Sequence, residues 1–276
     1  MILVTGATGN VGGELVTALA DAGQPVRALV RSAGQGRFPA GVQTMTGDLN
    51  DPATLRPALE GSDGVFLLPG YADMPAVLAE ARGAGVRTVV QLSGMSAGSG
   101  DMSNAITAYM ARSEQAARES GLAWTILRPA MFMSSALQWA PQLRAGDLVR
   151  APFGQVRAAV TDPADIAAVA AVALTAPGHE ARVYELSGPE PLTPAARVAI
   201  LGQALGRDLR FQAQTDTEAR AEMSAAMPAQ YVDAFFDFYV TGTLDESKVL
   251  PAVHEITGRP PRTFAQWAAT HAASFR

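Results

Sequence analysis

The sequence predicts an α/β protein built on a doubly wound parallel sheet, and two observations support this prediction. Short apolar runs alternate along the first half of the chain with longer stretches that have helical periodicity. The chain also opens with an apolar run, Ile2-Leu3-Val4, which is followed by closely spaced glycines and then by a helical pattern. Strands that are separated by helices of this length pair in parallel, with helices on both faces of the sheet.

The first half of the chain supplies most of the predicted sheet. The run from Val65 to Leu68 is apolar at every position, which is typical of a strand that is covered on both faces. Asp51 and Pro52 predict a helix start, with Asp51 as N-cap and the proline at the first helical position. The remaining strands are expected at residues 2–4, 25–30, 42–46, 86–92 and 123–127, and further helices at residues 74–83 and 103–119.

The alternation of strands and helices loosens after Pro129. Asp162 precedes an alanine-rich helix that should run to about Ala176, and Gly206 lies just past the end of another predicted helix. We expect the other helices of this half at residues 131–143, 194–205 and 263–273, and strands at residues 183–186 and 209–213.

Composition and charge narrow the class of protein. The chain has 276 residues, no cysteine and a formal net charge of -5, with no basic stripe, so nucleic acid is not expected as a partner. The longest apolar stretch, residues 167–174, is far shorter than the roughly 20 residues that span a bilayer. We expect a soluble, cytoplasmic protein without a signal peptide, and a homo-oligomer is compatible with the sequence.

Gly6, Gly9 and Gly12 predict a dinucleotide site of the Rossmann type. In such a βαβ unit the first glycine allows a sharp turn, the second lets the backbone approach a pyrophosphate, and the third lets the helix pack closely on the strand. The free N–H groups and the dipole at the helix N-terminus favour phosphate. The plain alternative is a tight turn without a ligand. The position of the glycines, directly after a strand and before an amphipathic helix, favours nucleotide binding.

Arg31 favours NADP(H) over NAD(H). Sites for NAD usually carry an acidic residue on the ribose 2′-hydroxyl about 20 residues past the glycines. Here the end of the second strand reads Leu29-Val30-Arg31-Ser32, which contains no acid. The guanidinium of Arg31 could contact a 2′-phosphate, and Arg37 is a second candidate in the same loop.

The chain resembles the NmrA-like, atypical short-chain dehydrogenase/reductases over most of its length. The similar segments are residues 5–12, 26–31, 47–49, the loop at Ser93, residues 121–129 and residues 161–167. The resemblance implies a Rossmann domain at 1–130 and a smaller α+β substrate lobe at 131–276 that is interleaved with the sheet. It also implies that Asp48 lies near the adenine, although a helix-entry turn would equally explain this residue. The cofactor residues expected from motif and resemblance are Gly6, Thr8, Gly9, Asn10, Val11, Gly12, Arg31, Asp48, Leu68, Pro69, Ser93, Pro129 and Phe132.

The proton relay of the family is missing from this chain. Extended members use Tyr-x-x-x-Lys, but the only lysine here is Lys248. Matching Glu114 to the family helix puts Ile106 and Met110 where the pair belongs. The proton for a reduction could then come from water or from one of the candidate donors, which are Ser93, Tyr71 and, with ordinary helix packing as the favoured alternative, Tyr109. An apolar substrate pocket could be lined by Tyr71, Met95, Met131, Met133, Trp139 and Phe235, although core packing is the alternative for each.

One further motif suggests a different chemistry. Residues 94–98 match Gly-x-Ser-x-Gly around Ser96, and Asp165 with His179 or His254 follows in the order of a hydrolase triad. A nucleophile elbow must lead directly into a helix, whereas residues 99–101 continue as loop, so we expect no serine hydrolase. The three histidines are far apart in sequence, and no metal site is expected.

Two hypotheses for function follow from these features. The first is an NADPH-dependent oxidoreductase that transfers hydride to a small apolar acceptor such as a quinone, an enone or another conjugated carbonyl compound. Hydride transfer needs no side-chain acid, because the cofactor carries the chemistry. The second is a non-catalytic NADP(H)-binding redox sensor that regulates a partner. An open cavity over the nicotinamide would favour the first hypothesis.

Overall fold

A single seven-stranded sheet organises the molecule. The computed structural model describes all residues from 1 to 276, and every strand pair of this sheet is parallel. The spatial order is β3-β2-β1-β4-β5-β6-β8, which is the Rossmann order with one strand added at the edge beyond β6. The strands are β1 (Ile2–Val4), β2 (Val26–Val30), β3 (Gln43–Thr46), β4 (Gly64–Leu67), β5 (Thr88–Leu92), β6 (Ala123–Pro129) and β8 (Arg182–Leu186).

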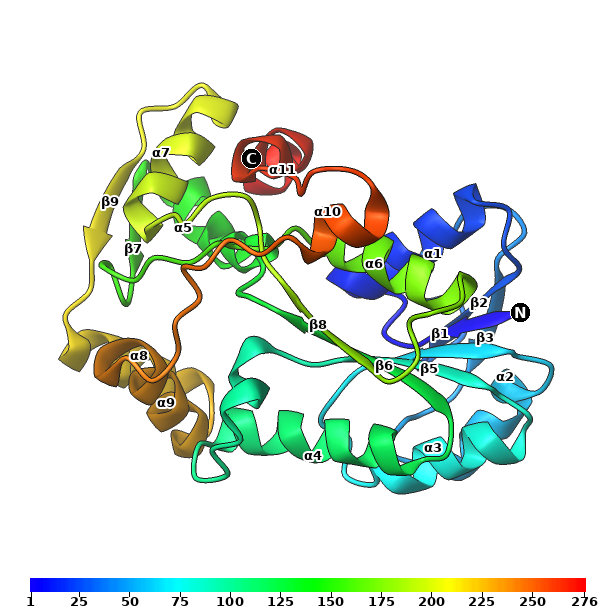
Figure 1. Cartoon of the computed structure of the whole chain (residues 1–276). Coiled ribbons are helices and arrows are strands. Elements are labelled where there is room, and N and C mark those ends of the chain that lie inside the picture. The colour runs from blue at the N-terminus through cyan, green and yellow to red at the C-terminus, as the bar shows by residue number, and fades with distance from the viewer.

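Helices cover both faces of this sheet (Figure 1). The helices α1 (Asn10–Asp21), α6 (Pro163–Thr175) and α10 (Ala252–Thr257) lie on one face, and their apolar side chains join alternate residues of the strands in one core. The helices α2 (Arg56–Leu59), α3 (Met74–Gly83) and α4 (Ala105–Glu119) form a second core on the other face. All four residues of β4 are buried, as expected for a central parallel strand that has no solvent face.

The predicted fold class is therefore correct, and the differences are local. The helix predicted from Asp51 begins as a 3₁₀ turn, Pro52–Leu55, and only then continues as α2. Asp51 is the N-cap residue of this turn and Pro52 its first residue, as predicted, but the Asp51 side chain accepts no capping hydrogen bond. The segment predicted as one helix over residues 131–143 is a 3₁₀ helix, Met133–Trp139, followed by α5 (Ala140–Ala145).

The C-terminal half contributes to the large sheet and also builds a separate core. Strand β8 and helix α6 belong to the sheet layer, so the two halves of the chain interleave. The third core contains Trp139, Phe264, Trp267 and Phe275, each at most 2% exposed. It lies between α5, α7 (Pro194–Leu205), α11 (Phe264–His271) and a parallel two-stranded sheet of β7 (Leu148–Ala151) and β9 (Arg210–Ala213) (Figure 1).

Two further helices, α8 (Asp216–Ala226) and α9 (Ala229–Phe236), form a small unit against the start of α4. The Asn104 side-chain amide joins the two parts, since it donates to the Ala234 carbonyl at 3.2 Å and to the Asp237 carboxylate at 2.9 Å. Phe153 has a left-handed backbone (φ 56°), and its ring packs edge-on against Phe236 with centroids 5.4 Å apart. Such a conformation costs about 1–3 kcal/mol in a non-glycine residue.

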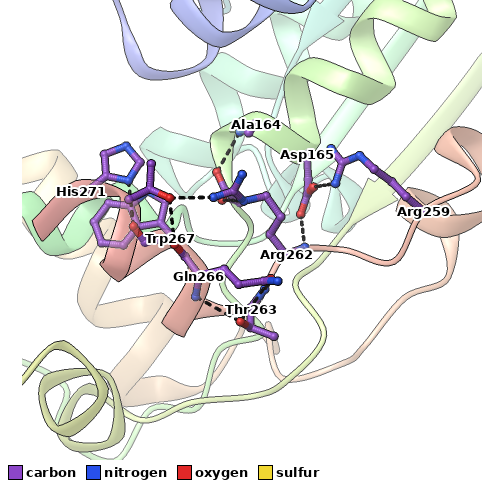
Figure 2. Close-up of polar contacts among 10 residues, drawn as sticks. Ala164, Asp165, Arg259, Arg262, Thr263, Gln266, Trp267 and His271 are labelled. Atoms are coloured by element: carbon purple, nitrogen blue, oxygen red, sulfur yellow. Dashed lines mark hydrogen bonds and ion pairs between the residues drawn. The ribbon is translucent and has the colours of Figure 1, made fainter. Parts of the chain in front are cut away.

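Asp165 fixes the C-terminal segment to the rest of the molecule, as Figure 2 shows. Its fully buried carboxylate accepts hydrogen bonds from Arg259 Nη1 at 2.6 Å and from the backbone N–H of Arg262 at 2.7 Å. The Arg262 guanidinium lies 2.8 Å from the Asp162 carboxylate, which also caps α6. The first turn of α6 therefore holds the chain that leads into α11.

Replacing Asp165 by Ala should lower the free energy of unfolding by about 3 kcal/mol, because it leaves a buried N–H and a guanidinium without their acceptor. The matched control is Asp147→Ala, which removes an exposed ion pair with Arg207 and should cost less than about 1 kcal/mol. Urea denaturation of both variants measures the difference. Equal losses would contradict this account of the C-terminal anchor.

Candidate cofactor and substrate site

The glycine loop between β1 and α1 leaves no room for side chains. Gly6 has a left-handed backbone (φ 60°), and a Cβ there would lie 2.4 Å from Leu68 Cδ1. A Cβ on Gly12 would lie 2.2 Å from the Gly6 carbonyl oxygen, which no side chain can adopt. At Gly9 the nearest protein atom would be 3.2 Å away, so the fold itself restricts this position much less.

The first turn of α1 presents free hydrogen-bond donors. The backbone N–H groups of Asn10, Val11 and Gly12 donate to no protein atom, and no side chain caps the helix at Gly9. The Asn10 amide donates to the Ser134 hydroxyl at 3.1 Å, which connects this turn to the segment after β6. Unpaired donors at a helix N-terminus beside an exposed glycine fit the pyrophosphate of a dinucleotide.

Arg31, Asp48 and Tyr71 lie near one another beyond the carboxyl ends of β2 and β3. The Arg31 side chain is exposed and forms no ion pair, and the Asp48 carboxylate accepts from the Asn50 N–H at 2.9 Å. Burial raises the pKa of Tyr71, while Arg31 lowers it and Asp48 raises it, so the phenol lies within Coulombic reach of both charges. Asp48 thus stabilises a local turn, and Tyr71 lies within Coulombic reach of Arg31, the residue predicted to bind the 2′-phosphate.

Ser93 belongs to a buried polar network at the end of β5. Its hydroxyl donates to Glu114 Oε1 at 2.6 Å, and the same carboxylate accepts hydrogen bonds from Arg128 and Arg118, each at 2.8 Å. Burial raises the pKa of Glu114, but the hydrogen bonds from Arg128 and Ser93 outweigh it and hold the pKa below its usual value. Glu114 remains ionised at neutral pH, and the Ser93 hydroxyl donates its proton to the Glu114 carboxylate, so it does not donate to a bound ligand.

Tyr109 lies on α4 where the loop after β4 passes over the helix. A Cβ on Gly70 would lie 3.2 Å from the Tyr109 ring, and the Gly70 N–H donates to the Ser113 hydroxyl at 3.0 Å. Burial raises the pKa of Tyr109, and Tyr231, whose ring packs edge-on at 6.4 Å, raises it further. The phenol stays neutral at physiological pH. In a Tyr-Lys pair the lysine lowers the pKa of the tyrosine, but no cation acts on Tyr109 in this way.

A large cavity lies between the C-terminal core and helices α8 and α9. We call it the lobe cavity; its volume is about 460 Å³, which suits a small molecule. A second, more open hollow of about 440 Å³, the loop cavity, lies beside Pro69, Gly70 and Tyr109. Met227 and Phe235 line both, so the two are neighbours. The lobe cavity is lined by Met131, Ser135, Gln138, Trp139, Ala151, Pro152, Phe153, Val156, Pro194, Arg197, Gln214, Glu222, Met223, Ala226, Met227, Phe235 and Tyr239.

The structure brings together only part of the predicted pocket. Met131, Trp139 and Phe235 line the lobe cavity. Met133 is 1% exposed within the third core, and Met95 lines a different, polar hollow that also contains Arg128. Tyr71 packs on the second core, near Arg31.

Among the residues that line the lobe cavity, Tyr239 and Arg197 were not predicted as site residues, and both interact with the buried carboxylate of Glu246. Glu246 is 6% exposed, accepts the Met131 N–H at 2.8 Å, and accepts the Tyr239 hydroxyl at 2.9 Å. Burial raises the pKa of Glu246, and burial with the Glu246 charge raises that of Tyr239. Arg197 completes the group, and burial lowers its pKa to about 10. These residues lie in segments without a recognisable motif, so no signal in the sequence could have selected them.

The hydrolase motif does not form a catalytic triad. Residues Met95–Ser99 form a 3₁₀ helix that ends at Gly100, and α4 begins only at Ala105, so Ser96 is not on a nucleophile elbow. Asp165 binds Arg259 and Arg262, while His179 is hydrogen-bonded to the Tyr184 hydroxyl at 2.8 Å. No group of three or more His, Asp or Glu side chains lies close enough together to hold a metal ion. None of the helices has the length and hydropathy needed to cross a bilayer.

Comparison with known proteins identifies the family. A family model described as NAD(P)H-binding matches residues 6–177, and the chain belongs to this NAD(P)H-binding family. The (4-alkanoyl-5-oxo-2,5-dihydrofuran-3-yl)methyl phosphate reductase of Streptomyces griseus is 44% identical, in an alignment covering 100% of this chain and 99% of the relative. An NAD(P)H azoreductase of Xenophilus azovorans is 40% identical with the same coverage.

A solved structure supports the fold independently of sequence. The NADPH-dependent quinone oxidoreductase of Escherichia coli, complexed with NADPH, superposes with a TM-score of 0.79 over 98% of this chain and 99% of that chain, at 24% identity. Family and relatives together define this protein as an NAD(P)H-dependent reductase of the NmrA-like, atypical short-chain dehydrogenase/reductase type.

Replacing Gly9 by Ala should weaken NADPH binding by about tenfold or more, because the added methyl group occupies space that the pyrophosphate needs. Within the protein the added Cβ would lie 3.2 Å from the Gly6 carbonyl oxygen, a tight contact that a small shift relieves. Gly13→Ala is the matched control: it adds the same group one turn further along α1, where its Cβ would be 3.4 Å from the Ala7 carbonyl oxygen. Fluorescence titration of NADPH measures both affinities. Unchanged binding in a folded Gly9→Ala variant would contradict the assignment of the site.

Proposed function

We propose that this protein is an NADPH-dependent reductase of small, largely apolar conjugated acceptors, such as quinones, enones and other conjugated carbonyl compounds. The lobe cavity is the observation that carries the proposal. It is lined mainly by apolar side chains and reaches Met131, which follows β6 at the carboxyl edge of the sheet. Ligands of open α/β sheets bind at this edge. The names of the relatives, a furanone phosphate reductase, an azoreductase and a quinone oxidoreductase, share a conjugated acceptor.

In this proposal, separate segments of the chain bind the parts of the cofactor and the acceptor. The α1 N-terminus would hold the pyrophosphate, Arg31 the 2′-phosphate, and the segment Pro129–Phe132 would flank the nicotinamide. When bound, NADPH supplies the hydride. Met227, directly after α8, and Phe235 of α9 would close the acceptor against this edge and exclude bulk water.

The proton that completes the reduction comes, in this proposal, from water. The Ser93 hydroxyl already donates to Glu114, and the Tyr239 hydroxyl already donates to Glu246. Tyr71 lies beside Arg31 and Asp48, in the part of the site that we assign to the adenosine 2′-phosphate. Quinones and enones suit this arrangement, because the product of hydride addition is a stabilised anion that water can protonate.

The purified protein should oxidise NADPH in the presence of at least one member of a panel of quinones and enones. The measurement is the loss of absorbance of the reduced nicotinamide. The test variant is Phe235→Ala, which enlarges the lobe cavity. The control is Val240→Ala, because the Val240 side chain is 50% exposed and does not line the cavity. Phe235→Ala should raise KM for the acceptor. Tight NADPH binding without turnover on the whole panel would instead favour the regulatory redox sensor.

Replacing Arg31 by Ser should weaken NADPH binding by about tenfold or more and leave NADH binding nearly unchanged, because only NADPH carries the 2′-phosphate. Arg37→Ser, in the same exposed loop, serves as the comparison. Titration of each variant with both nucleotides gives the four affinities. Equal losses for NADPH and NADH in Arg31→Ser would contradict the proposed preference for NADP(H).

A further inference from the structure

Arg197 is a buried cation in the wall of the lobe cavity. It lies in the first turn of α7, which begins at Pro194, and its residue is 5% exposed. It is the only arginine among the buried residues of the chain. Arg197 itself lines the lobe cavity, together with Trp139 and Tyr239, so a small molecule bound there would lie next to it.

The guanidinium forms no ion pair within the protein. Its Nη1 lies 3.5 Å from Met131 Sδ and 3.5 Å from Ser135 Oγ, and its Nε is buried without a hydrogen-bond acceptor. The group lies over the Trp139 ring, 5.4 Å from the centroid. These contacts are weak replacements for the hydration that burial removes, and an unpaired buried charge is costly.

The carboxyl groups nearest to this site are already engaged. Glu246 is within Coulombic reach of Arg197, but its two oxygens accept the Met131 N–H and the Tyr239 hydroxyl. Glu222 lines the cavity from α8, where it is exposed and accepts a hydrogen bond from Gln214. Neither carboxylate forms an ion pair with Arg197.

Other arginines that reach into the interior have close hydrogen-bond acceptors, either a carboxylate or, for the half-buried Arg27, the backbone carbonyls of Ala58 at 2.6 Å and Glu60 at 2.8 Å. Arg128 forms two hydrogen bonds of 2.8 Å with Glu114, and Arg259 binds Asp165 at 2.6 Å. Arg197 is the exception, and it is the one that faces a cavity large enough for a ligand. Its missing partner is therefore expected to come from the ligand.

We propose that Arg197 binds an anionic group of the substrate, a phosphate monoester or a carboxylate, and so selects amphipathic acceptors that combine a conjugated body with one oxyanion. This inference rests on the proposed function and specifies its substrate class. The planar guanidinium offers a pair of N–H donors that matches either oxyanion. With a pKa of about 10, Arg197 remains cationic at neutral pH. The apolar lining would hold the rest of the molecule.

The test compares small phenyl compounds with and without an anionic group. Phenyl phosphate, benzoate and benzyl alcohol are titrated calorimetrically into the NADP⁺-loaded protein. At least one of the two anions should bind about tenfold or more tightly than the alcohol, and the stronger of the two identifies which oxyanion the site prefers. Binding of all three ligands with equal affinity would overturn the proposal.

Variants then assign the preference to Arg197. Arg197→Met should abolish the preference for the anion, Arg197→Lys should retain part of it, and the exposed Arg157→Met should leave it unchanged. Arg197→Met should also fold with an unchanged or raised Tm, because an apolar side chain replaces an unpaired buried charge. A lowered Tm together with an intact preference for the anion would assign Arg197 a structural role and overturn the proposal.

Turnover separates this inference from the proposed function. NADPH oxidation is measured with 2-methyl-1,4-naphthoquinone and with the same ring carrying a carboxymethyl group or a phosphoryloxymethyl group. Reduction of all three with equal kcat/KM would leave the reductase intact and overturn the role of Arg197. Binding of the anions through Arg197 without any NADPH oxidation would support the anion site and contradict the proposed function.

Discussion

The close approach of α1 to the loop that precedes it is the constraint on which the rest of the site depends. A Cβ on Gly12 would lie 2.2 Å from the Gly6 carbonyl oxygen, and Gly6 has a left-handed backbone with a Cβ position 2.4 Å from Leu68 Cδ1, so both residues must be glycine. This position of α1 leaves the N–H groups of the first turn pointing away from any protein acceptor, at the carboxyl edge of the sheet. The proposed site for a phosphate is therefore a consequence of backbone packing.

Buried carboxylates paired with arginines join helices of both sheet faces to neighbouring segments of the chain. Glu114 joins α4 to β6 through Arg128, and Asp165 joins α6 to the segment before α11 through Arg259. The Asp165 contacts hold the segment that leads into the C-terminal core against α6, and the lobe cavity lies between that core and helices α8 and α9. The one buried arginine outside such a pair, Arg197, faces that cavity.

The fold could be predicted because its signals are local: apolar runs, helix periodicity and the glycine spacing at Gly6, Gly9 and Gly12 each lie within a short window of sequence. The cavity residues could not be predicted in the same way. Arg197 is a candidate ligand-binding residue because it contacts Met131, more than sixty positions earlier in the sequence, and forms no ion pair with a carboxylate. Both features depend on three-dimensional packing. The structural role of Asp165 could not be predicted for the same reason. Its position in the sequence fits a hydrolase triad, but in the fold its carboxylate binds Arg259 and the backbone of Arg262.

The central claim is that one continuous site joins the α1 N-terminus to the lobe cavity. A crystal structure of the protein with NADP⁺ and a carboxylated naphthoquinone tests it most directly. The account predicts the pyrophosphate on the N–H groups of Asn10 to Gly12, the nicotinamide beside Met131, and the quinone in the lobe cavity with its carboxylate on Arg197. A nicotinamide that faces away from this cavity, or a quinone bound elsewhere, would contradict it.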